Sequence, residues 1–437
     1  MSSDAVQPLK IGDFAQVKGG KRMPAGTALV SVKTQHPYLR IVDFKDGSID
    51  KSNLQYVPDE VFPSVSRYTI SSNDLYISIV GTIGLVGKVP VELSGANLTE
   101  NAAKICQIDP TVMNRDYLGY FLRSEMGQGA ISSMTVGSTQ PKLALFRIEQ
   151  IEVPCPALGI QESIVSVLNA LDDRITLLRE TNTTLEAIAQ ALFKSWFVDF
   201  DPVHAKMQGR APEGMDEATA ELFPDSFEES ELGPVPKGWQ VKSLDAVASF
   251  LNGLALQKFP PTGDNDLPVI KIAQLRKGDT VGADLASRSI KPEYLVQNGD
   301  VLFSWSGSLE VEIWCGGEGA LNQHLFKVTS GAFPKWFYFL WTRHHLEHFR
   351  QVAASKATTM GHIQRAHLTG AKVLVPSDGV LNAANSVLEP IMQRVIENSL
   401  QAYNLAALRD TLLPRLISGQ LRLSGLELIS NAEVLSE

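Results

Sequence analysis

The chain has 437 residues, 44% of them hydrophobic and 20% charged, with a formal net charge of −9. These values exclude a wholly disordered chain and a miniature disulfide scaffold, and they predict two or three domains with buried cores. Its three cysteines form no Cys-x-x-Cys pair, so we expect neither a zinc site nor a disulfide framework. No apolar stretch approaches the roughly 18 residues of a membrane span, and the start does not resemble a signal peptide. We therefore expect a cytoplasmic protein without membrane contact.

Residues 1–157 contain short runs of Val, Ile and Phe separated by Gly, Pro and Asn, as in LYISIVGTIGLVGKVPV. Such runs predict strands joined by tight turns. Residues 158–198 follow a different pattern, in which apolar side chains recur in alternating steps of four and three. This heptad pattern predicts a long amphipathic helix. Its expected seam and partner-facing residues are Leu168, Leu171, Ile175, Leu178, Asn182, Leu185, Leu192, Trp196 and Phe197.

Residues 199–232 carry most of the acidity and are also rich in Pro and Gly, so we expect an exposed acidic linker. Residues 233–376 return to the pattern of strands and turns, and residues 377–424 are predicted to form a second long helix before a tail at 425–437. Pro390 and Pro414 are expected to mark ends or a kink in this helix, and Arg409 interrupts its seam. The other seam residues are Leu388, Val395, Asn398, Leu405, Leu412 and Leu416.

The two halves form an internal repeat. A shift of 220 residues aligns them without gaps over roughly 80 positions, matching Pro156 with Pro376 and Leu185 with Leu405. The turn VGTIG at 80–84 falls opposite WSGSL at 305–309. A helix of about 37 residues spans roughly 55 Å, which suggests a spacer. We expect the two helices to pair as a coiled coil whose register Asn182 and Asn398 set. The alternative is that each helix covers its own domain.

Motifs for catalysis are absent from the sequence. It has no GxxxxGK[ST] phosphate loop, no GxGxxG, no NPPY- or DPPF-like methyltransferase tetrapeptide and no Glu-x-Lys nuclease signature. His344, His345 and His348 lie close together in a half that also holds His324, His362 and His367. Without an HExxH order, surface or core histidines are the preferred interpretation, with a metal site or contacts to DNA phosphates as alternatives.

Polar and basic residues in the glycine-rich turns are the candidates for nucleic-acid contact, because Arg and Lys can bind guanine edges, Gln and Asn can bind adenine, and backbone amides can hold phosphate. In the first half they are Lys18, Lys21, Arg22, Lys33, Arg40, Thr82, Ser138, Thr139, Gln140 and Lys142. In the second half they are Lys258, Lys271, Arg276, Ser306, Thr358, Thr359, His362 and Arg365. For each one alone, an ordinary solvated role competes with base contact.

Three segments carry a resemblance to a known family. ALFKSWFVDFDPVHAKMQG at 191–209, LRDTLLPRLISGQLRL at 408–423 and IQESIVSVLNALDDRI at 160–175 resemble the conserved segments of DNA specificity subunits of type I restriction-modification systems. GSTQPKLALFRIEQIEVPCP and TTMGHIQRAHLTGAKVLVP resemble the ends of the two target recognition domains of that family.

The resemblance implies an α+β fold with two tandem-repeated α/β target recognition domains, separated by two long antiparallel coiled-coil helices in a pseudo-two-fold arrangement. It implies a non-catalytic chain that binds double-stranded DNA at a split, asymmetric site. Two copies of a methyltransferase subunit and the restriction (translocase) subunits would be its partners. S-adenosylmethionine, ATP and Mg²⁺ would bind to those partners and not to this chain. The rival interpretation is a scaffold or regulatory protein that organises partners through its helices without reading DNA.

Overall fold

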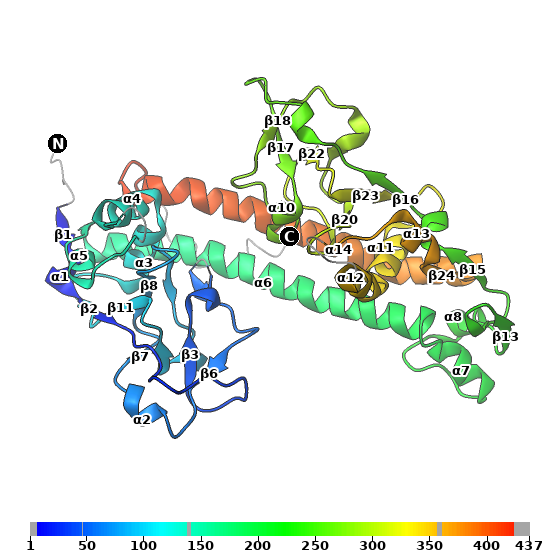
Figure 1. The fold of residues 1–437 in the computed structure, drawn as a ribbon, viewed down its shortest axis with the longest axis horizontal. Coiled ribbons are helices and arrows are strands. Elements are labelled where there is room, and N and C mark those ends of the chain that lie inside the picture. The colour runs from blue at the N-terminus through cyan, green and yellow to red at the C-terminus, as the bar shows by residue number, and fades with distance from the viewer. Residues whose placement is uncertain (1–6, 46, 138–140, 356–360, 424–437) are drawn as a thin grey trace. The chain divides into compact units, whose positions relative to one another are not determined.

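A computed structural model describes residues 7–45, 47–137, 141–355 and 361–423. The chain divides into two compact units. The first unit comprises Met1–Asp173 and Ala406–Glu437, and the second comprises Arg174–Leu405. Each long helix therefore contributes one part to each unit (Figure 1).

The first unit contains two four-stranded sheets, ordered β2-β11-β8-β9 and β6-β3-β10-β7. β3 and β10 run parallel, and the other strand pairs of these sheets run antiparallel. Two further antiparallel pairs, β1-β12 and β4-β5, complete the strands. The bounds are β1 Pro8–Lys10, β2 Gln16–Gly19, β3 Pro37–Leu39, β4 Phe44–Lys45, β5 Ser48–Ile49, β6 Gln55–Tyr56, β7 Thr69–Ile70, β8 Leu75–Ser78, β9 Val86–Lys88, β10 Ala96–Leu98, β11 Ala102–Cys106 and β12 Glu152–Pro154.

Helices cover the β2-β11-β8-β9 sheet and form the main core of the first unit with it. The helix α3 begins after Asn114, whose side chain accepts hydrogen bonds from the backbone amides of Asp116 and Tyr117. This cap satisfies amides that a helix end leaves without partners. The helices of this unit are α1 Ile11–Phe14, η1 Ile41–Asp43, α2 Phe62–Val65, η2 Val91–Leu93, α3 Arg115–Arg123, α4 Glu125–Met134 and α5 Leu145–Glu149.

The second unit repeats this topology. Its sheets are ordered β16-β23-β20-β21 and β18-β17-β22-β19, and β17 pairs with β22 in parallel as β3 does with β10. The internal repeat inferred from the sequence is thus confirmed in the order and direction of the strands. The strands are β15 Gln240–Ser243, β16 Ser249–Asn252, β17 Leu267–Ile270, β18 Leu285–Ala286, β19 Leu295–Val296, β20 Val301–Ser304, β21 Val311–Ile313, β22 Gly319–Leu321, β23 Leu325–Thr329 and β24 Lys372–Val375. The helices are α9 Leu244–Val247, η3 Leu256–Lys258, α10 Ile272–Lys277, η4 Pro292–Tyr294, α11 Lys335–His344, α12 Leu346–Ser355 and α13 Arg365–Gly370.

Most residues of the acidic segment 199–232 are exposed, as its composition suggests, but the segment is folded. It forms α7 Asp201–Met207, α8 Glu217–Glu221 and β13 Phe227–Ser230, which pairs with β14 Gly233–Pro236. Val203 and Phe223 are buried in the core of the second unit, and the ammonium of Lys206 donates to the carbonyl oxygens of Ala220 and Phe223. A few apolar side chains therefore hold the segment against the core. Composition does not reveal this, because burial depends on the positions of the apolar residues and not on their number.

The two long helices are α6 Leu158–Phe197 and α14 Asp378–Ile417, each of 40 residues, and they pack antiparallel. Pro390 and Pro414 lie inside α14, so neither proline ends it. Each helix packs its first part on its own module and its last part on the other, so both pairing and covering occur. In the described part of the chain, no helix has the combined length and apolar character that a membrane crossing requires.

The expected seam positions differ in how deeply they are buried. Leu171, Leu185, Leu192, Trp196, Leu405 and Leu412 are partly buried. Those that are fully buried are Leu168, Ile175, Leu178, Asn182, Phe197, Leu388, Val395, Asn398 and Leu416.

Asn182 and Asn398 meet in the second unit, as the heptad pattern suggests. Nδ2 of Asn398 donates to Oδ1 of Asn182 at 2.9 Å, and Nδ2 of Asn182 donates to the carbonyl oxygen of Val395 and to Oγ of Ser399, both at 2.9 Å. Both amides are buried. A buried polar pair of this kind favours one register, since a shifted helix would leave the amides without partners.

We expect Asn182→Leu alone to destabilise the chain by about 1–3 kcal/mol, because Asn398 would lose a buried hydrogen-bond partner. The double variant with Asn398→Leu should recover most of this loss, since two leucines leave no polar side chain unsatisfied. Urea unfolding of the wild type, both single variants and the double variant would measure the coupling. If the double variant lost as much stability as the two single variants together, the pair would not act as a unit.

Candidate nucleic-acid interface

In the first unit, three turns at one end of the β2-β11-β8-β9 sheet are joined by backbone hydrogen bonds. The amide of Leu143 donates to the carbonyl oxygen of Ile79 at 3.0 Å, and the amide of Ile79 donates to that of Asn101 at 2.8 Å. Lys142 also pairs with Val80 as an isolated bridge. The turn after β8, which carries exposed Thr82, therefore lies beside the segment that carries exposed Lys142.

The segment after β2 joins the same cluster of turns. The amide of Lys21 donates to the carbonyl oxygen of Leu98 at 2.8 Å. A Cβ atom at Gly20 would stand 2.1 Å from the carbonyl oxygen of Thr99, so only glycine permits this close approach. The sequence Gly-Lys-Arg is thereby held against the turn at 98–101.

Arg22 and Glu100 form an ion pair at this place, with Nε of Arg22 2.6 Å from Oε1 of Glu100. Burial opposes ionisation of Glu100, but the hydrogen bonds from Arg22, from its own backbone amide and from Thr99, together with the charge of Arg22, outweigh burial, and the pKa of Glu100 is lowered. The side chain of Arg22 remains 79% exposed. Glu100 holds Nε, and the two terminal nitrogens of this exposed guanidinium are donors of the kind that bind a guanine edge.

Lys21 is positioned by two tyrosines. Its ammonium stands 5.6 Å from the ring centroid of Tyr68, and the hydroxyl of Tyr38 donates to its carbonyl oxygen at 2.8 Å. Burial raises the pKa of Tyr38, so its hydroxyl stays protonated and remains a donor. Lys21, Arg22, Thr82 and Lys142 are thus brought to one cluster of turns.

The second unit builds the same cluster with different side chains. Ser306 pairs with His362, and the amide of Ile363 donates to the carbonyl oxygen of Trp305 at 2.9 Å. Gly253 takes the place of Gly20, since its Cβ would stand 2.2 Å from the carbonyl oxygen of Asn322. The turn cluster is therefore a repeated feature of the two units.

Polar side chains around Trp305 are connected by hydrogen bonds. Its Nε1 donates to Oδ1 of Asn252 at 2.9 Å, and Oγ of Ser306 lies 2.9 Å from Nδ1 of His324. Ser306 is only 3% exposed, so its hydroxyl supports His324 and does not face solvent. Sequence reasoning missed Glu100, Asn252 and Trp305 as members of these clusters. The internal repeat could have identified these residues, because they lie in or beside turns that align between the two halves of the sequence.

Several candidates lie elsewhere. Arg40 binds Asp43, which is 3% exposed, with Nη2 and Oδ1 2.7 Å apart, so it serves the fold. Lys271 pairs with Asp284, and Nη2 of Arg365 donates to the carbonyl oxygen of Phe250 at 3.1 Å although its side chain is exposed. Lys18, Lys33, Lys258 and Arg276 are exposed. Ser138, Thr139, Gln140, Thr358 and Thr359 lie outside the described residues.

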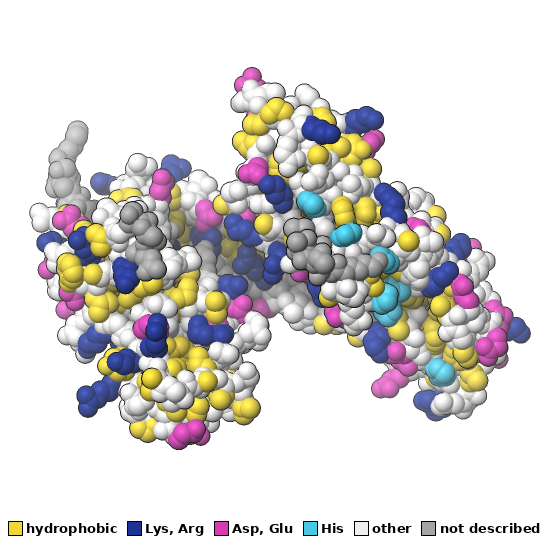
Figure 2. Space-filling model, in the orientation of Figure 1, with side chains coloured by type: hydrophobic (Ala, Val, Ile, Leu, Met, Phe, Trp, Pro, Cys, Tyr) yellow, Lys and Arg dark blue, Asp and Glu magenta, His cyan; other side chains and the backbone are white. Residues whose placement is uncertain are grey.

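The histidines of the second unit include core residues. Burial lowers the pKa of His345 to about 4, and its Nε2 lies 2.8 Å from the carbonyl oxygen of Lys372, to which the neutral ring donates. Burial also lowers the pKa of His344. Within residues 7–45, 47–137, 141–355 and 361–423, no group of three or more His, Cys, Asp or Glu is arranged to hold a metal. Figure 2 shows histidine side chains in a line over one face of this unit.

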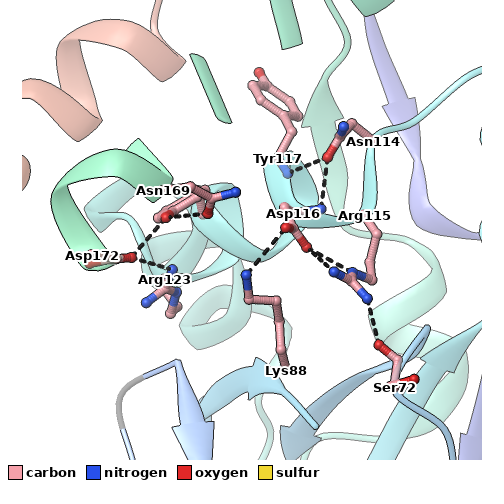
Figure 3. A network of polar contacts seen from close by, with 10 residues as sticks. Ser72, Lys88, Asn114, Arg115, Asp116, Tyr117, Arg123, Asn169 and Asp172 are labelled. Atoms are coloured by element: carbon pink, nitrogen blue, oxygen red, sulfur yellow. Dashed lines mark hydrogen bonds and ion pairs between the residues drawn. The ribbon is translucent and has the colours of Figure 1, made fainter. Parts of the chain in front are cut away.

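A polar network ties the first module to α6 (Figure 3), and Arg409 extends it to α14. The hydroxyl of Tyr120 donates to Asn169 at 2.9 Å and to Asp172 at 2.7 Å. Asp172 also accepts from Nη1 of Arg409 at 2.7 Å, so the residue that interrupts the heptad seam has a charged partner. The same module is braced inside by an ion pair of Lys88 with Asp116 at 3.2 Å. These contacts hold the turn cluster on a rigid base.

Comparison with known proteins identifies relatives over most of the chain. A family model described as "Type I restriction modification DNA specificity domain" matches residues 4–187. The MjaIX specificity subunit of a type I restriction enzyme from Methanocaldococcus jannaschii is 25% identical, and the match covers 95% of this chain and 94% of that protein. The HindI specificity subunit from Haemophilus influenzae is 24% identical, with 86% and 87% covered.

One solved structure supports the fold. The crystal structure of the type I restriction-modification S subunit from M. genitalium matches with a TM-score of 0.52 at 13% identity. The match covers 95% of this chain and 97% of that one. The likeness extends over both units and the long helices.

Proposed function

We propose that this chain is a specificity subunit of a type I restriction-modification system and that it reads a bipartite, asymmetric DNA site, with one recognition domain for each half-site. The proposed recognition domains are residues 1–157 and 233–376. The spacer helices are residues 158–198 and 377–424. The observation that carries the proposal is the turn cluster. Each unit has one at the equivalent end of its equivalent sheet, but the side chains differ between the two.

The two clusters supply different chemistry for reading bases. In the first unit, the guanidinium of Arg22 matches the two acceptors that guanine shows in the major groove. In the second, the side-chain amide of Asn252 and the ring of His324 lie near Trp305, and they suit base edges other than that of guanine. Exposed Lys142 and His362 occupy equivalent positions suited to phosphate. Because the two units share one fold but carry different residues in these turns, we expect them to read different half-sites.

Specificity subunits are non-catalytic, so the chemistry belongs to partner subunits. We propose two methyltransferase copies and restriction (translocase) subunits as partners, with S-adenosylmethionine, ATP and Mg²⁺ bound to them. Exposed apolar side chains on the long helices are a surface that partners could cover. They are Ile160, Leu177, Ile188, Val387, Tyr403 and Leu408. The net charge of −9 also favours partners that supply the positive charge needed for strong DNA binding.

The deciding experiment maps adenine methylation by single-molecule sequencing in cells that express this chain with its methyltransferase. We expect a bipartite methylated motif that is absent without the chain. In Arg22→Ala, one base pair of one half-site should lose about 10- to 100-fold of its preference, because a bidentate contact to guanine contributes about 1–3 kcal/mol.

Arg210→Ala is the matched control, since Arg210 is also exposed but bonds to Gln208 away from the turns. It should leave the motif unchanged. An active methyltransferase with no motif that depends on the chain would instead support a scaffold that does not read DNA. An unchanged motif in Arg22→Ala would remove Arg22 from the readout and leave the family assignment intact.

A further inference from the structure

The second unit contains a cavity of about 150 Å³ where β21 and α11 face the two long helices. Its walls are partly apolar, with Leu340, Ile391 and Met392, and partly polar, with Glu186, Glu312 and Arg343. Gln190, which is exposed, also lines it, so the cavity borders on solvent. This volume equals that of an apolar protein cavity that holds benzene, about 150 Å³, so a molecule of about seven non-hydrogen atoms fits.

The charges around the cavity are not balanced. Nη1 of Arg343 pairs with Oε2 of Glu186 at 3.0 Å, and Glu312 adds a second carboxyl to the same wall. Arg343 is paired with Glu186 and Arg350 with Glu310, and among the described residues Glu312 forms no salt bridge. Burial raises the pKa of Glu312 to about 7. One more positive charge in the cavity would therefore give Glu312 a partner of opposite charge.

The equivalent place in the first unit holds a second guanidinium, with a carboxylate partner of its own. Gly87 pairs with Tyr76 as Glu312 pairs with Leu302, and Arg123 and Arg343 are matched by the shift of 220 residues. Gly87 and Arg123 line a hollow of only about 10 Å³. Next to it, Asp172 binds the guanidinium of Arg409 on α14.

The repeat places Ala189 opposite Arg409, so the second unit has a methyl group where the first has a guanidinium. Ala189 lines the large cavity. The short side chain of Ala189 leaves space that a guanidinium occupies in the first unit. The carboxylates of the two places also differ, because Met392 stands where the first unit has Asp172, and Glu312 stands where it has Gly87.

We propose that the cavity in the second unit binds a small organic cation, a guanidinium or primary ammonium group on a short alkyl chain. The cationic group would bind Glu312 and Glu186, and the alkyl chain would pack on Leu340, Ile391 and Met392. Binding would strengthen the contact of the second recognition module with the long helices. This site goes beyond the proposed DNA reading, since it uses none of the turn residues.

The test uses the full chain and two probes of the same shape, N-propylguanidinium and the neutral N-propylurea. We expect the cation to raise the thermal unfolding midpoint in a saturable way and the urea derivative to leave it unchanged. Glu312→Gln should fold, because burial raises the pKa of the native carboxyl and so favours its neutral form, which Gln resembles in shape, and it should lose the response to the cation.

Ala189→Arg should raise the midpoint without any probe and should abolish the probe's effect, because its own guanidinium would fill the cavity. Ala187→Arg, at an exposed position on the same helix, is the control for added charge and should keep the response. An equal response to both probes would show an apolar void only and would overturn the proposal. A response that persists in Glu312→Gln, or none in the wild type, would overturn it as well.

The pH dependence is a second readout. The charged groups that face Glu312 are Glu186, Glu310, Arg343 and Arg350, and α14 adds no charged residue to the cavity lining. Burial raises the pKa of the Cys315 thiol, so it stays neutral. Ionisation of Glu312 should then make the cation bind about tenfold more tightly at pH 8 than at pH 6. Binding that is independent of pH over this range would contradict the role of Glu312.

Discussion

Exchanging residues 244–371 for the corresponding segment of a related type I specificity subunit is expected to change one half of the methylated motif and to leave the other half as it was. The second unit contains its own sheets and its own turn cluster, so the base contacts proposed for it use no residue of the first unit. The amide of Leu244 donates to the carbonyl oxygen of Ala371 at 2.8 Å, so both junctions lie side by side. Methylation mapping would report the new half-site.

This exchange is narrower than the proposed domain because β14 begins at Gly233 and pairs with β13. A cut at residue 233 would divide that hairpin. A donor with Arg at the position of Arg343 keeps the ion pair with Glu186 on α6. The control is an exchange with a protein whose turn-cluster residues are identical to those of this chain, which should reproduce the original motif. A change in both half-sites would show that the two modules do not read DNA independently.

Duplicating residues 179–185 in α6 together with 395–401 in α14 is expected to widen the gap between the half-sites by about three base pairs. Seven residues lengthen a helix by about 10.5 Å, and DNA rises about 3.4 Å per base pair. A seven-residue insertion also keeps the heptad seam on the same face. Each new segment carries its own asparagine, so a second pair like Asn182 with Asn398 can form. The half-sites themselves should stay unchanged.

The matched control duplicates residues 179–185 in α6 alone. The helices are antiparallel, so this would move the two parts of α6 out of register with α14 and leave buried amides unpaired. We expect loss of motif-specific methylation and a lower unfolding temperature. A gap that keeps its width after the paired duplication would contradict the spacer role of the helices.

The sequence alone determined the features that depend on local spacing. Alternating steps of four and three place Leu168 and Ile175 on one helix face. The helix expected over 158–198 is α6 at 158–197, and the helix expected over 377–424 is α14, which ends earlier, at Ile417. Matching residues at a constant shift revealed the repeat, which the strand order confirms. Periodicity is readable in one dimension because neighbours three or four residues apart lie on the same side of a helix.

Only the tertiary structure decided which distant residues meet. Arg22 pairs with Glu100 because β2 and β11 are adjacent strands, which no local pattern reveals. Arg40 looked like a base-reading residue, but the nearby buried Asp43 holds it. The acidic segment packs on the second unit because Val203 and Phe223 are buried in the core of that unit. The cavity at Ala189 likewise exists only where four elements come together. Contacts between residues far apart in the chain depend on how sheets and helices assemble, and burial and charge are defined only after that assembly.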